Sequence, residues 1–515
     1  MQHPGPAGAR SPRLRGRVMR RIIAKRPDAS DGVVLALACV AQFMVVLDVS
    51  IVTVALPSIG RDLHYTASGL PWVVNAYVLT FAGFLLFGGR AADLFGRRRS
   101  YLFGLGLFTV ASLVGGVAQT SVWLTAARAA QGVGGAFLSP ASLTIIVTTF
   151  TDRQRRARAI GMWSAVAGAG GAAGAILGGV LTAELSWRWV LFVNLPIGVI
   201  TAAAAAAYLT ELRRPSGDGG RPRIDIGGAV TITAGLGVLV YAIIETSTHA
   251  WLSAFTLSGL AVAVVLLAAF AVIEHRQATA ALVPFQLLRS RSVAGANAVM
   301  LLVGAAFFAM WYFLSLYLQD VLGYSALRAG LAFIPMAIAI MAGAQASPRL
   351  LPRTGLRPLL AGGMLLAAGG FAWLAGIPAQ GSYAAHVLGP GLIVALALGL
   401  LFTPLATAAT TGVPLSQAGL ASGVLNTSRQ VGGSIGLAAL ATVAVARTHS
   451  VFATGHSAAG ALAAGYDRAF AIAAVLSLIG LVCCLLIPTA GHAQRVEERQ
   501  ALPSPQHSAD QGPPL

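Results

Sequence analysis

Two charged residues stand alone inside long apolar segments of this sequence. Asp48 lies within Val45–Pro57, and Arg128 lies near the start of the segment 122–148. A carboxylate costs about 2.5 to 3.5 kcal/mol at the centre of a membrane-spanning helix on insertion scales, so it is commonly functional there. A nearby cation favours the charged carboxylate, whereas burial favours the neutral acid. Such opposed effects allow an acid to exchange protons, and the alternative is an ion pair that only stabilises the structure.

The elements that position these residues are predicted to be membrane-spanning helices. The chain has 515 residues, of which 56% are hydrophobic and only 10% are charged. Soluble globular proteins carry about 25% charged residues. Apolar runs of about 20 residues, enough for a helix to cross the hydrocarbon core, recur from Val33 to Pro488. The sequence therefore predicts an all-α polytopic membrane protein.

Fourteen spans are predicted, and they place the two charges at similar depth. The predicted ranges are 33–56, 70–89, 100–118, 122–148, 159–183, 189–209, 226–245, 253–273, 292–318, 328–347, 358–377, 387–411, 421–445 and 469–489. Asp48 is about eight residues from the outer end of the first span, and Arg128 about six from the outer end of the fourth. At about 1.5 Å per residue, their side chains can meet.

The basic residues predict the orientation of the chain in the membrane. With the amino terminus inside, 28 of the 35 basic residues fall in the tails and inner loops, and five fall outside. An excess of arginine on one side marks the cytoplasmic side. We therefore expect both termini in the cytoplasm and the protein in a bacterial cytoplasmic membrane, surrounded by the lipid bilayer. The net charge of +18 reports this topology and indicates no nucleic-acid partner.

Two pairs of loops repeat with a common offset of 259 residues. Leu63–Ser68 resembles Leu322–Leu327, and Phe95–Arg98 resembles Thr354–Arg357. Paired repeats with a site near the membrane midplane are a transporter architecture. The predicted organisation is a basic cytoplasmic tail (1–32), an N-terminal six-helix bundle (33–210), a linker with two extra spans (211–291), a C-terminal six-helix bundle (292–490) and a second cytoplasmic tail (491–515).

The sequence offers little to other kinds of chemistry. A phosphate-binding loop ends in Lys-Ser or Lys-Thr, but the only lysine, Lys25, precedes Arg26. The three cysteines lie in apolar runs without metal-ligand spacing. We therefore expect no enzyme activity, no metal and no cofactor, and a proton gradient as the source of energy.

The segment from Gly89 to Arg99 is predicted to form a tight inner turn between the second and third spans. Its motif residues are Gly89, Asp93, Gly96, Arg97 and Arg98. Their spacing resembles the signature loop of the major facilitator superfamily. The resemblance implies a loop that latches the inner gate, with Arg97 paired to Asp152 at the inner end of the fourth span. A plain positively charged inner loop is the alternative for Arg98 and Arg99.

The fourth and fifth spans carry further patterns of the same superfamily. Arg128 and Gln131 precede a Gly-x-Gly, which resembles a fourth-helix motif tied to proton coupling; the alternative is that Arg128 snorkels to the outer surface. In the fifth span, glycines recur so that another backbone can approach closely, which ordinary helix packing also explains. These glycines are Gly170, Gly174, Gly178 and Gly179. Antiporters of this superfamily have a proline where this chain has Ala175, which leaves the direction of transport open.

Three other stretches narrow the resemblance. They are Trp187–Gly198, Tyr317–Ser325 and Gly419–Gly433, the last of which contains Arg429 and Gln430. With fourteen spans, they resemble the EmrB/QacA drug:proton antiporters over about residues 33–490. The resemblance implies a proton-coupled antiporter that exports drugs, antibiotics or natural products by alternating access between two six-helix bundles. We expect it to function as a monomer.

Few side chains inside the predicted spans are suited to contact a substrate. The candidates are Asn75, Gln131, Asn194, Asn297, Trp311, Tyr312 and Glu245. Importers usually hold their substrates through several polar contacts, so this sparse set favours export over import. Beyond Asp48 the only clear acid within a span is Glu245, so we expect lipophilic aromatic substrates that are neutral or singly charged. The alternatives are a proton symporter that imports a small solute and a membrane sensor that transports nothing.

Overall fold

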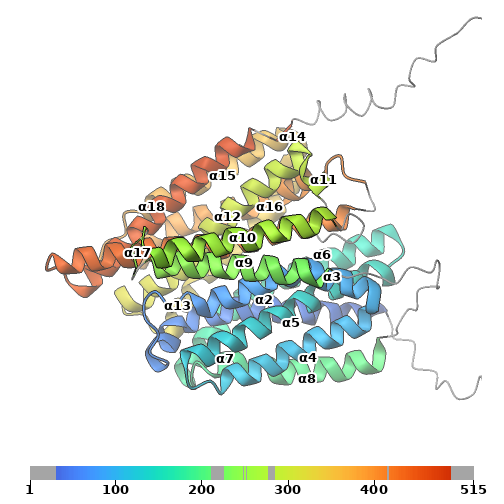
Figure 1. Ribbon diagram of the computed structural model, residues 1–515, viewed down its shortest axis with the longest axis horizontal. Helices are drawn as coiled ribbons and strands as arrows, with labels where there is room; N and C mark the ends of the chain where they lie inside the picture. Colours follow the sequence, from blue (N-terminus) through green and yellow to red (C-terminus); the bar gives the residue numbers. More distant parts are fainter. Residues whose placement is uncertain are drawn as a thin grey trace, which may run out of the picture.

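The computed structural model describes residues 31–209, 225–246, 249–250, 252–276, 285–414, 417–485 and 487–488. Within this part of the chain every regular element is a helix, and the long helices run side by side (Figure 1). Thirteen helical segments of the described residues are long and apolar enough to cross a membrane. The prediction of an all-α polytopic membrane protein is confirmed.

The first half of the chain forms one packed set of helices, which we call the N-terminal group. It consists of α2 (Asp31–Asp62), α3 (Trp72–Phe95), α4 (Arg97–Gly116), α5 (Ser121–Thr149), α6 (Arg153–Glu184), α7 (Trp189–Phe192) and α8 (Asn194–Tyr208). Its most extensive contacts join α3 and α4 to α5, and α2 to α6. Helix α4 takes the place of the third predicted span. It is not among the thirteen segments, because three arginines in its first turn lower its mean hydropathy.

The second half forms a similar set, the C-terminal group. It consists of α12 (Arg291–Leu316), η1 (Tyr317–Val321), α13 (Ala326–Ala332), α14 (Ile334–Thr354), α15 (Leu356–Leu374), η2 (Tyr383–Leu388), α16 (Gly389–Thr410), α17 (Ala418–Ala453) and α18 (Ala458–Cys484). Its most extensive contacts join α12 to α17 and α14 to α16. The short helix α11 (Phe285–Leu288) precedes it.

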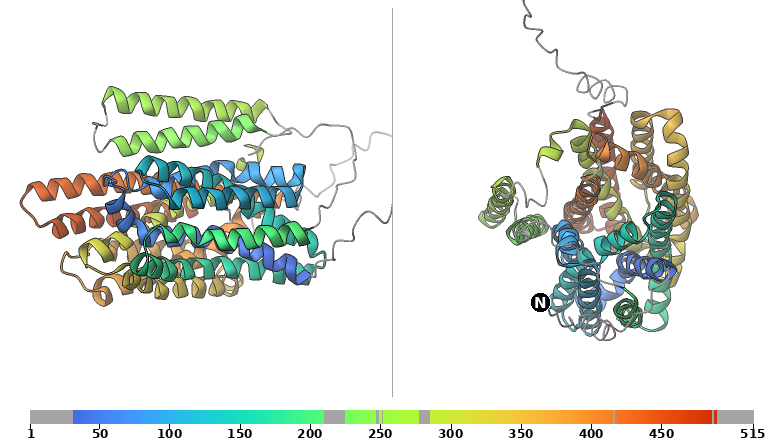
Figure 2. Two further views of the ribbon diagram at one scale, coloured as in Figure 1. Left: turned by 90° about the horizontal axis from the view of Figure 1, so that it is seen from below. Right: turned by 90° about the vertical axis from the view of Figure 1, so that its right-hand side faces the viewer.

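In the sequence, α9 (Ile226–Glu245) and α10 (Ala254–Arg276) come between the two groups. In space they form a hairpin that lies to one side of the bundle (Figure 2). Helix α9 packs on α3 and on α17, so it touches both groups. Leu79 of α3, Val240 of α9 and Ala438 of α17 belong to one buried cluster there. Helix α10 packs chiefly on α9, and most of its apolar side chains are exposed.

The repeat in the sequence has a counterpart in the structure. Gly96 and Gly355 each join two consecutive helices at a positive φ, of 103° and 81°, which favours glycine. Two residues after each glycine an arginine reaches the C-terminal end of the last helix of its group. Arg98 donates to the carbonyl of Ala206 in α8 at 2.8 Å, and Arg357 donates to that of Leu485 after α18 at 3.0 Å. Cations suit these ends because free carbonyls gather there.

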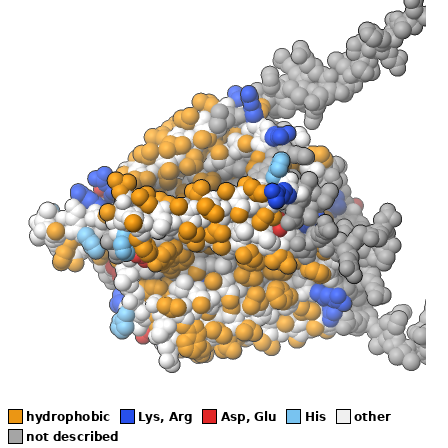
Figure 3. Space-filling view, viewed as in Figure 1, with side chains coloured by type: hydrophobic (Ala, Val, Ile, Leu, Met, Phe, Trp, Pro, Cys, Tyr) orange, Lys and Arg blue, Asp and Glu red, His pale blue; other side chains and the backbone are white. Residues whose placement is uncertain are grey.

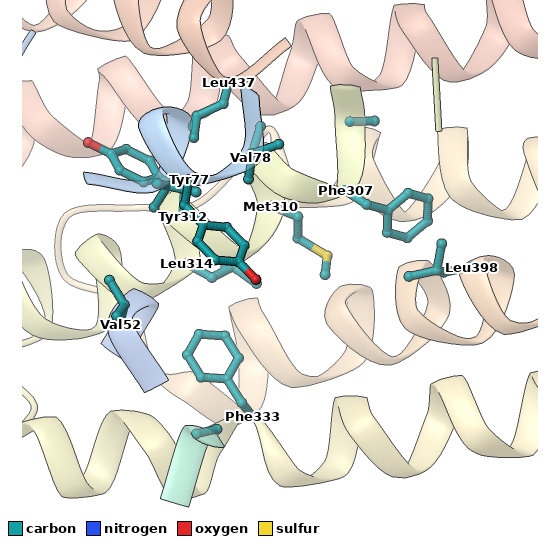
Figure 4. Packing of buried hydrophobic residues seen from close by; sticks show 14 of the residues in the cluster. Val52, Tyr77, Val78, Phe307, Met310, Tyr312, Leu314, Phe333, Leu398 and Leu437 are labelled. Carbon is teal, nitrogen blue, oxygen red and sulfur yellow. The ribbon is translucent and has the colours of Figure 1, made fainter. Parts of the chain in front are cut away.

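A continuous apolar core extends through both groups. In Figure 4, Val52 of α2 and Val78 of α3 lie close to side chains of the C-terminal group, such as Tyr312 of α12 and Leu437 of α17. On the face shown in Figure 3, hydrophobic side chains cover the middle of the molecule and charged side chains lie near its two ends. This distribution fits a bilayer around the middle.

The two groups are joined at the end of the molecule where α2 terminates, which we call the Asp62 end. Gln319 of η1 donates to the carbonyl of Val54 at 2.9 Å, and Arg61 lies 3.8 Å from Asp320. Ser315 of α12 donates to the carbonyl of Thr53 at 2.9 Å. Toward the opposite, Asp31 end, α6 and α14 expose side chains such as Met162 and Arg349. Along α6 the groups are therefore closely packed at the Asp62 end, and α6 and α14 expose more of their side chains towards the other end.

A candidate proton-coupling site around Asp48

Asp48 lies on α2 with its side chain completely buried. Its Oδ2 accepts a hydrogen bond from Nη1 of Arg128 at 2.5 Å. Its Oδ1 accepts from Nε2 of Gln131 at 2.6 Å and from Nδ2 of Asn194 at 3.2 Å. Donors from α5 and α8 thus surround the carboxylate, and hydrogen bonds to a charged acceptor are the stronger kind.

Arg128 is also buried, with 1% of its surface exposed. Besides Asp48, its guanidinium donates to Oε1 of Gln131 at 2.7 Å and to the carbonyl of Val73 in α3 at 3.1 Å. Its Cζ lies 4.5 Å from the ring centroid of Tyr77, a distance at which the ring face attracts a cation. Arg128 therefore points into the N-terminal group, and it does not snorkel to the surface.

Ser112 of α4 completes the site, and sequence reasoning missed it. Its hydroxyl accepts from Gln131 at 2.7 Å and from Asn194 at 3.2 Å. Asn194 Oδ1 is buried with no hydrogen-bond partner among the described residues. A protonated carboxyl group is a donor, whereas a charged one only accepts. The network therefore has donors for charged Asp48 and an unused acceptor close to it for protonated Asp48.

The glycines of α6 bring this helix against the segment of α2 that carries Asp48. A Cβ added to Gly170 would lie 3.0 Å from the carbonyl oxygen of Phe43, and one on Gly174 or Gly178 would lie 2.7 Å from that of Leu47 or Ile51. Gly179 faces the other way, where its Cβ would lie 2.8 Å from the carbonyl oxygen of Ala326 in α13. Helix α6 thus contacts α2 on one face and the C-terminal group on another. Ala175 is buried in this uninterrupted helix.

The inner turn is shorter than predicted. The residues from Gly89 to Phe95 form the last turns of α3, and the chain reverses at Gly96 alone. Apolar Leu94 and Phe95 continue the helix, which is why the prediction of a turn from Gly89 was wrong. Arg98 binds the end of α8, and the side chain of Asp93 lies outside the described residues.

The predicted partners Arg97 and Asp152 do not pair in this conformation. Asp152 caps α6 by accepting from the backbone N–H of Arg155 at 2.8 Å. Among the described side chains, no ion pair joins it to Arg97, which is half-buried at the start of α4. An N-cap carboxylate accepts such a bond at the positive end of a helix. The Arg97–Asp152 pair that the resemblance implies is therefore not formed here.

The remaining substrate candidates are scattered. Asn75 is buried, and its Oδ1 accepts a hydrogen bond from the hydroxyl of Ser434 in α17 at 3.2 Å. Oδ1 of Asn297 accepts from the hydroxyl of Ser428 at 2.8 Å. Trp311 is half-buried, and its ring is tilted by 50° against that of Phe333, with 5.0 Å between the ring centroids. Tyr312 is buried in the core, with 3% of its surface exposed. Tyr312 is enclosed by core packing, and Glu245 lies at the end of α9, 3.5 Å from His249.

Arg429 and Gln430 lie on α17, in the C-terminal group. Arg429 is half-buried and donates to Oδ1 of Asn426 at 2.9 Å. Gln430 is buried, and its Oε1 has no hydrogen-bond partner among the described residues. Neither belongs to the Asp48 network, so the motif in the second half marks a separate place. No group of histidine, cysteine and acidic side chains suited to a metal occurs in the described part of the chain.

Fold and site together define a polytopic membrane transporter. The Major Facilitator Superfamily matches residues 38–437, and the chain belongs to this family, as the sequence motifs predicted. A cephamycin export protein from Amycolatopsis lactamdurans is 44% identical over 459 residues, which cover 88% of this chain and 92% of that protein. A puromycin resistance protein from Streptomyces alboniger is 37% identical over 487 residues, which cover 93% of this chain and 96% of that protein.

A solved structure supports the same fold. A bacterial homologue of the human lysosomal transporter spinster, in an inward-facing and unoccupied conformation, superposes with a TM-score of 0.61. The two share 17% sequence identity, and the match covers 89% of this chain and 97% of the other. At this identity the likeness concerns the arrangement of helices.

Proposed function

We propose that this protein is a proton-coupled antiporter that exports lipophilic small molecules across the bacterial cytoplasmic membrane. Relatives that share most of its length export or confer resistance to antibiotics. Within this chain, the observation that carries proton coupling is the completely buried Asp48, which is held by donors from two other helices. A buried carboxylate inside a membrane costs free energy, so such residues are commonly functional.

Protonation of Asp48 changes the balance of charge in the network. While the carboxylate is charged, it neutralises Arg128. Once it binds a proton, Arg128 keeps only the carbonyl of Val73, the amide of Gln131 and the ring of Tyr77. Since α2, α5 and α8 each contribute to the network, a change of protonation alters contacts between three helices. This links proton binding to helix movement.

The distribution of arginines assigns the Asp62 end to the outer side and both termini to the cytoplasm. In this conformation the two groups are packed at the Asp62 end, so the site would be reached from the cytoplasm. A substrate would bind from inside, the groups would rock, and protons would enter from outside. The protein acts alone in this scheme, as a monomer, with no cofactor other than the proton gradient.

The test is transport of puromycin by purified protein in proteoliposomes, with a pH-sensitive dye inside. Asp48→Asn mimics the permanently protonated acid, so uphill transport driven by a pH gradient should vanish. Passive equilibration of puromycin can persist in this variant. A symporter would move protons with the substrate rather than against it, and a sensor would move neither.

A matched control is Asp62→Asn on the same helix. Asp62 is half-exposed at the end of α2, where it accepts from Trp187 at 2.8 Å and from Arg188 at 3.2 Å. Its loss should leave coupled transport close to that of the unmodified protein. If Asp48→Asn still exchanges protons for puromycin, Asp48 is structural and the coupling site lies elsewhere.

A further inference from the structure

Arg429 is a second cation inside the membrane-spanning region, and it has no acidic partner. It lies about eleven residues into α17, or about 16 Å from the start of that helix. Its guanidinium donates to Asn426 at 2.9 Å and has its Cζ 5.8 Å from the ring centroid of Phe402 in α16. Among the described residues it forms no ion pair.

The helix that carries Arg429 and the two helices that lie beside it, α12 and α16, lack acidic residues. The sequences of α12, α16 and α17 contain no aspartate or glutamate. Asp48 is occupied by Arg128, and Asp320 faces Arg61 at the Asp62 end. No described carboxylate is therefore placed to neutralise this guanidinium.

The surroundings of Arg429 are aromatic and belong to the C-terminal group. Its backbone carbonyl lies against Gly304 of α12, and one turn further Gly433 lies against the ring of Phe308. Trp311 is three residues after Phe308 and so shares its face of α12. These aromatic side chains and Phe402 are all partly buried rather than enclosed. Arg429, half-buried as a whole residue, is thus accompanied by aromatic rings that are also only partly buried.

An intramembrane cation without an acidic partner is costly, and the binding of an anion offsets part of that cost. A guanidinium has a planar fork of donors that fits a carboxylate with two parallel hydrogen bonds. We propose that Arg429 binds the carboxylate of a singly charged, aromatic substrate. This inference rests on the proposed export function and names the class of substrate that the C-terminal group recognises. The rings of Phe308 and Phe402 contact the apolar part of the same molecule.

The experiment compares two probes that differ in charge alone. Pyrenebutyrate carries a carboxylate, and pyrenebutanol is its neutral counterpart. Binding of each is followed by pyrene fluorescence in nanodiscs that contain the protein, after subtraction of empty nanodiscs. The unmodified protein should bind the carboxylate about tenfold more tightly than the alcohol. Arg429→Gln should remove this preference, and Arg429→Lys should keep part of it, because lysine retains the charge without the fork.

Arg155→Gln is the matched control, since Arg155 is an exposed arginine at the Asp31 end that pairs with Asp31 at 3.4 Å. It should leave the preference unchanged. The proposal is overturned if the unmodified protein shows no preference, if Arg429→Gln weakens both probes equally, or if the control loses the preference too. Should Arg429→Gln not fold, Arg429→Lys and the two-probe comparison still decide. Binding needs no gradient, so a failure of proton coupling would leave this assay unaffected.

Discussion

At the scale of single residues, Gln131 is the centre of the Asp48 network. It donates to both Asp48 and Ser112 and accepts from Arg128. Asn194 makes two longer contacts, each of 3.2 Å, to Asp48 and Ser112. A single interhelical hydrogen bond in a membrane contributes about 0.6 kcal/mol on average. Gln131 makes more and shorter hydrogen bonds than Asn194, so it contributes more to the stability of the network.

We expect Gln131→Leu to impair coupled transport more than Asn194→Leu. Loss of Gln131 removes a donor that holds the charged carboxylate and its link to Ser112, so the rate of coupled transport should fall. Asn194→Leu should cause a smaller fall. The measurement is the rate of proton-driven puromycin transport at equal amounts of protein. An equal or larger effect of Asn194→Leu would contradict this ranking.

The sequence allowed the proximity of Asp48 and Arg128 to be predicted, but it did not predict Ser112. Depth follows from the count of residues along a span, because each adds about 1.5 Å. Which side of a helix faces the network depends on how neighbouring helices are rotated, and apolar spans show little contrast between faces. Gln131 and Asn194 were both candidates for the substrate cavity, and Gln131 also belonged to the fourth-helix motif tied to proton coupling. The structure places both at Asp48.

At the scale of elements, the close contact between α6 and α2 depends on glycines, which have no side chain to keep the two helices apart. Gly174 packs directly on the backbone at Leu47 and on the side chain of Ser50, next to Asp48. Ser50 also donates to the carbonyl of Gly171 at 2.6 Å. The position of Asp48 is thus set partly by a helix that contributes no side chain to its network.

Gly174→Val should reduce transport and lower the melting temperature, because overpacking of such a contact costs about 1 to 3 kcal/mol. Its Cβ would lie 2.7 Å from the carbonyl oxygen of Leu47, which has to move. Gly161→Val on the same helix is the control, since nothing lies within 4 Å of its Cβ. Transport assays and thermal unfolding in detergent measure both effects. Equal tolerance of the two substitutions would show that α2 adapts freely.

Hydropathy predicted the existence of the helices better than their ends. The seventh span, 226–245, coincides with α9, but the last, predicted from 469, begins at Ala458. Asp467 and Arg468 interrupt the apolar run there, yet the backbone continues its hydrogen bonds through them. Hydropathy reports the part of a helix that lies in hydrocarbon, and helices extend beyond it.

At the scale of the whole molecule, the contacts at the Asp62 end hold one conformation. Gln319→Leu with Ser315→Ala removes the hydrogen bonds to Val54 and Thr53. We expect this double variant to open the Asp62 end more often. The measurement is labelling of Thr53→Cys by an impermeant maleimide from outside, with the three native cysteines replaced by serine.

The control for this prediction is Thr454→Val, a residue that directly follows α17 at the Asp62 end of the molecule. Thr454 bonds only to residues of its own turn, Val451 and His456. Labelling should therefore stay at its original rate in this variant. Unchanged labelling of the double variant would mean that these contacts do not hold the Asp62 end closed.

The conformation in which the Asp31 end is closed should depend on Arg97 and Asp152, which do not pair in this structure. Single reversals, Arg97→Asp or Asp152→Arg, should abolish transport while expression stays near normal. The reversal of both together should recover part of the activity if they pair when the Asp31 end closes. Transport by the three variants is compared at equal amounts of protein in the membrane. No recovery would indicate separate roles.

The hairpin of α9 and α10 makes the two sides of the molecule unequal toward the lipid. Helix α9 covers the line where α3 meets α17, whereas the line between α6 and α14 has no such cover among the described residues. A lipophilic molecule dissolved in the bilayer thus meets a covered contact line on one flank and an uncovered contact line on the other. Molecules that arrive by lateral diffusion would then enter from one direction only.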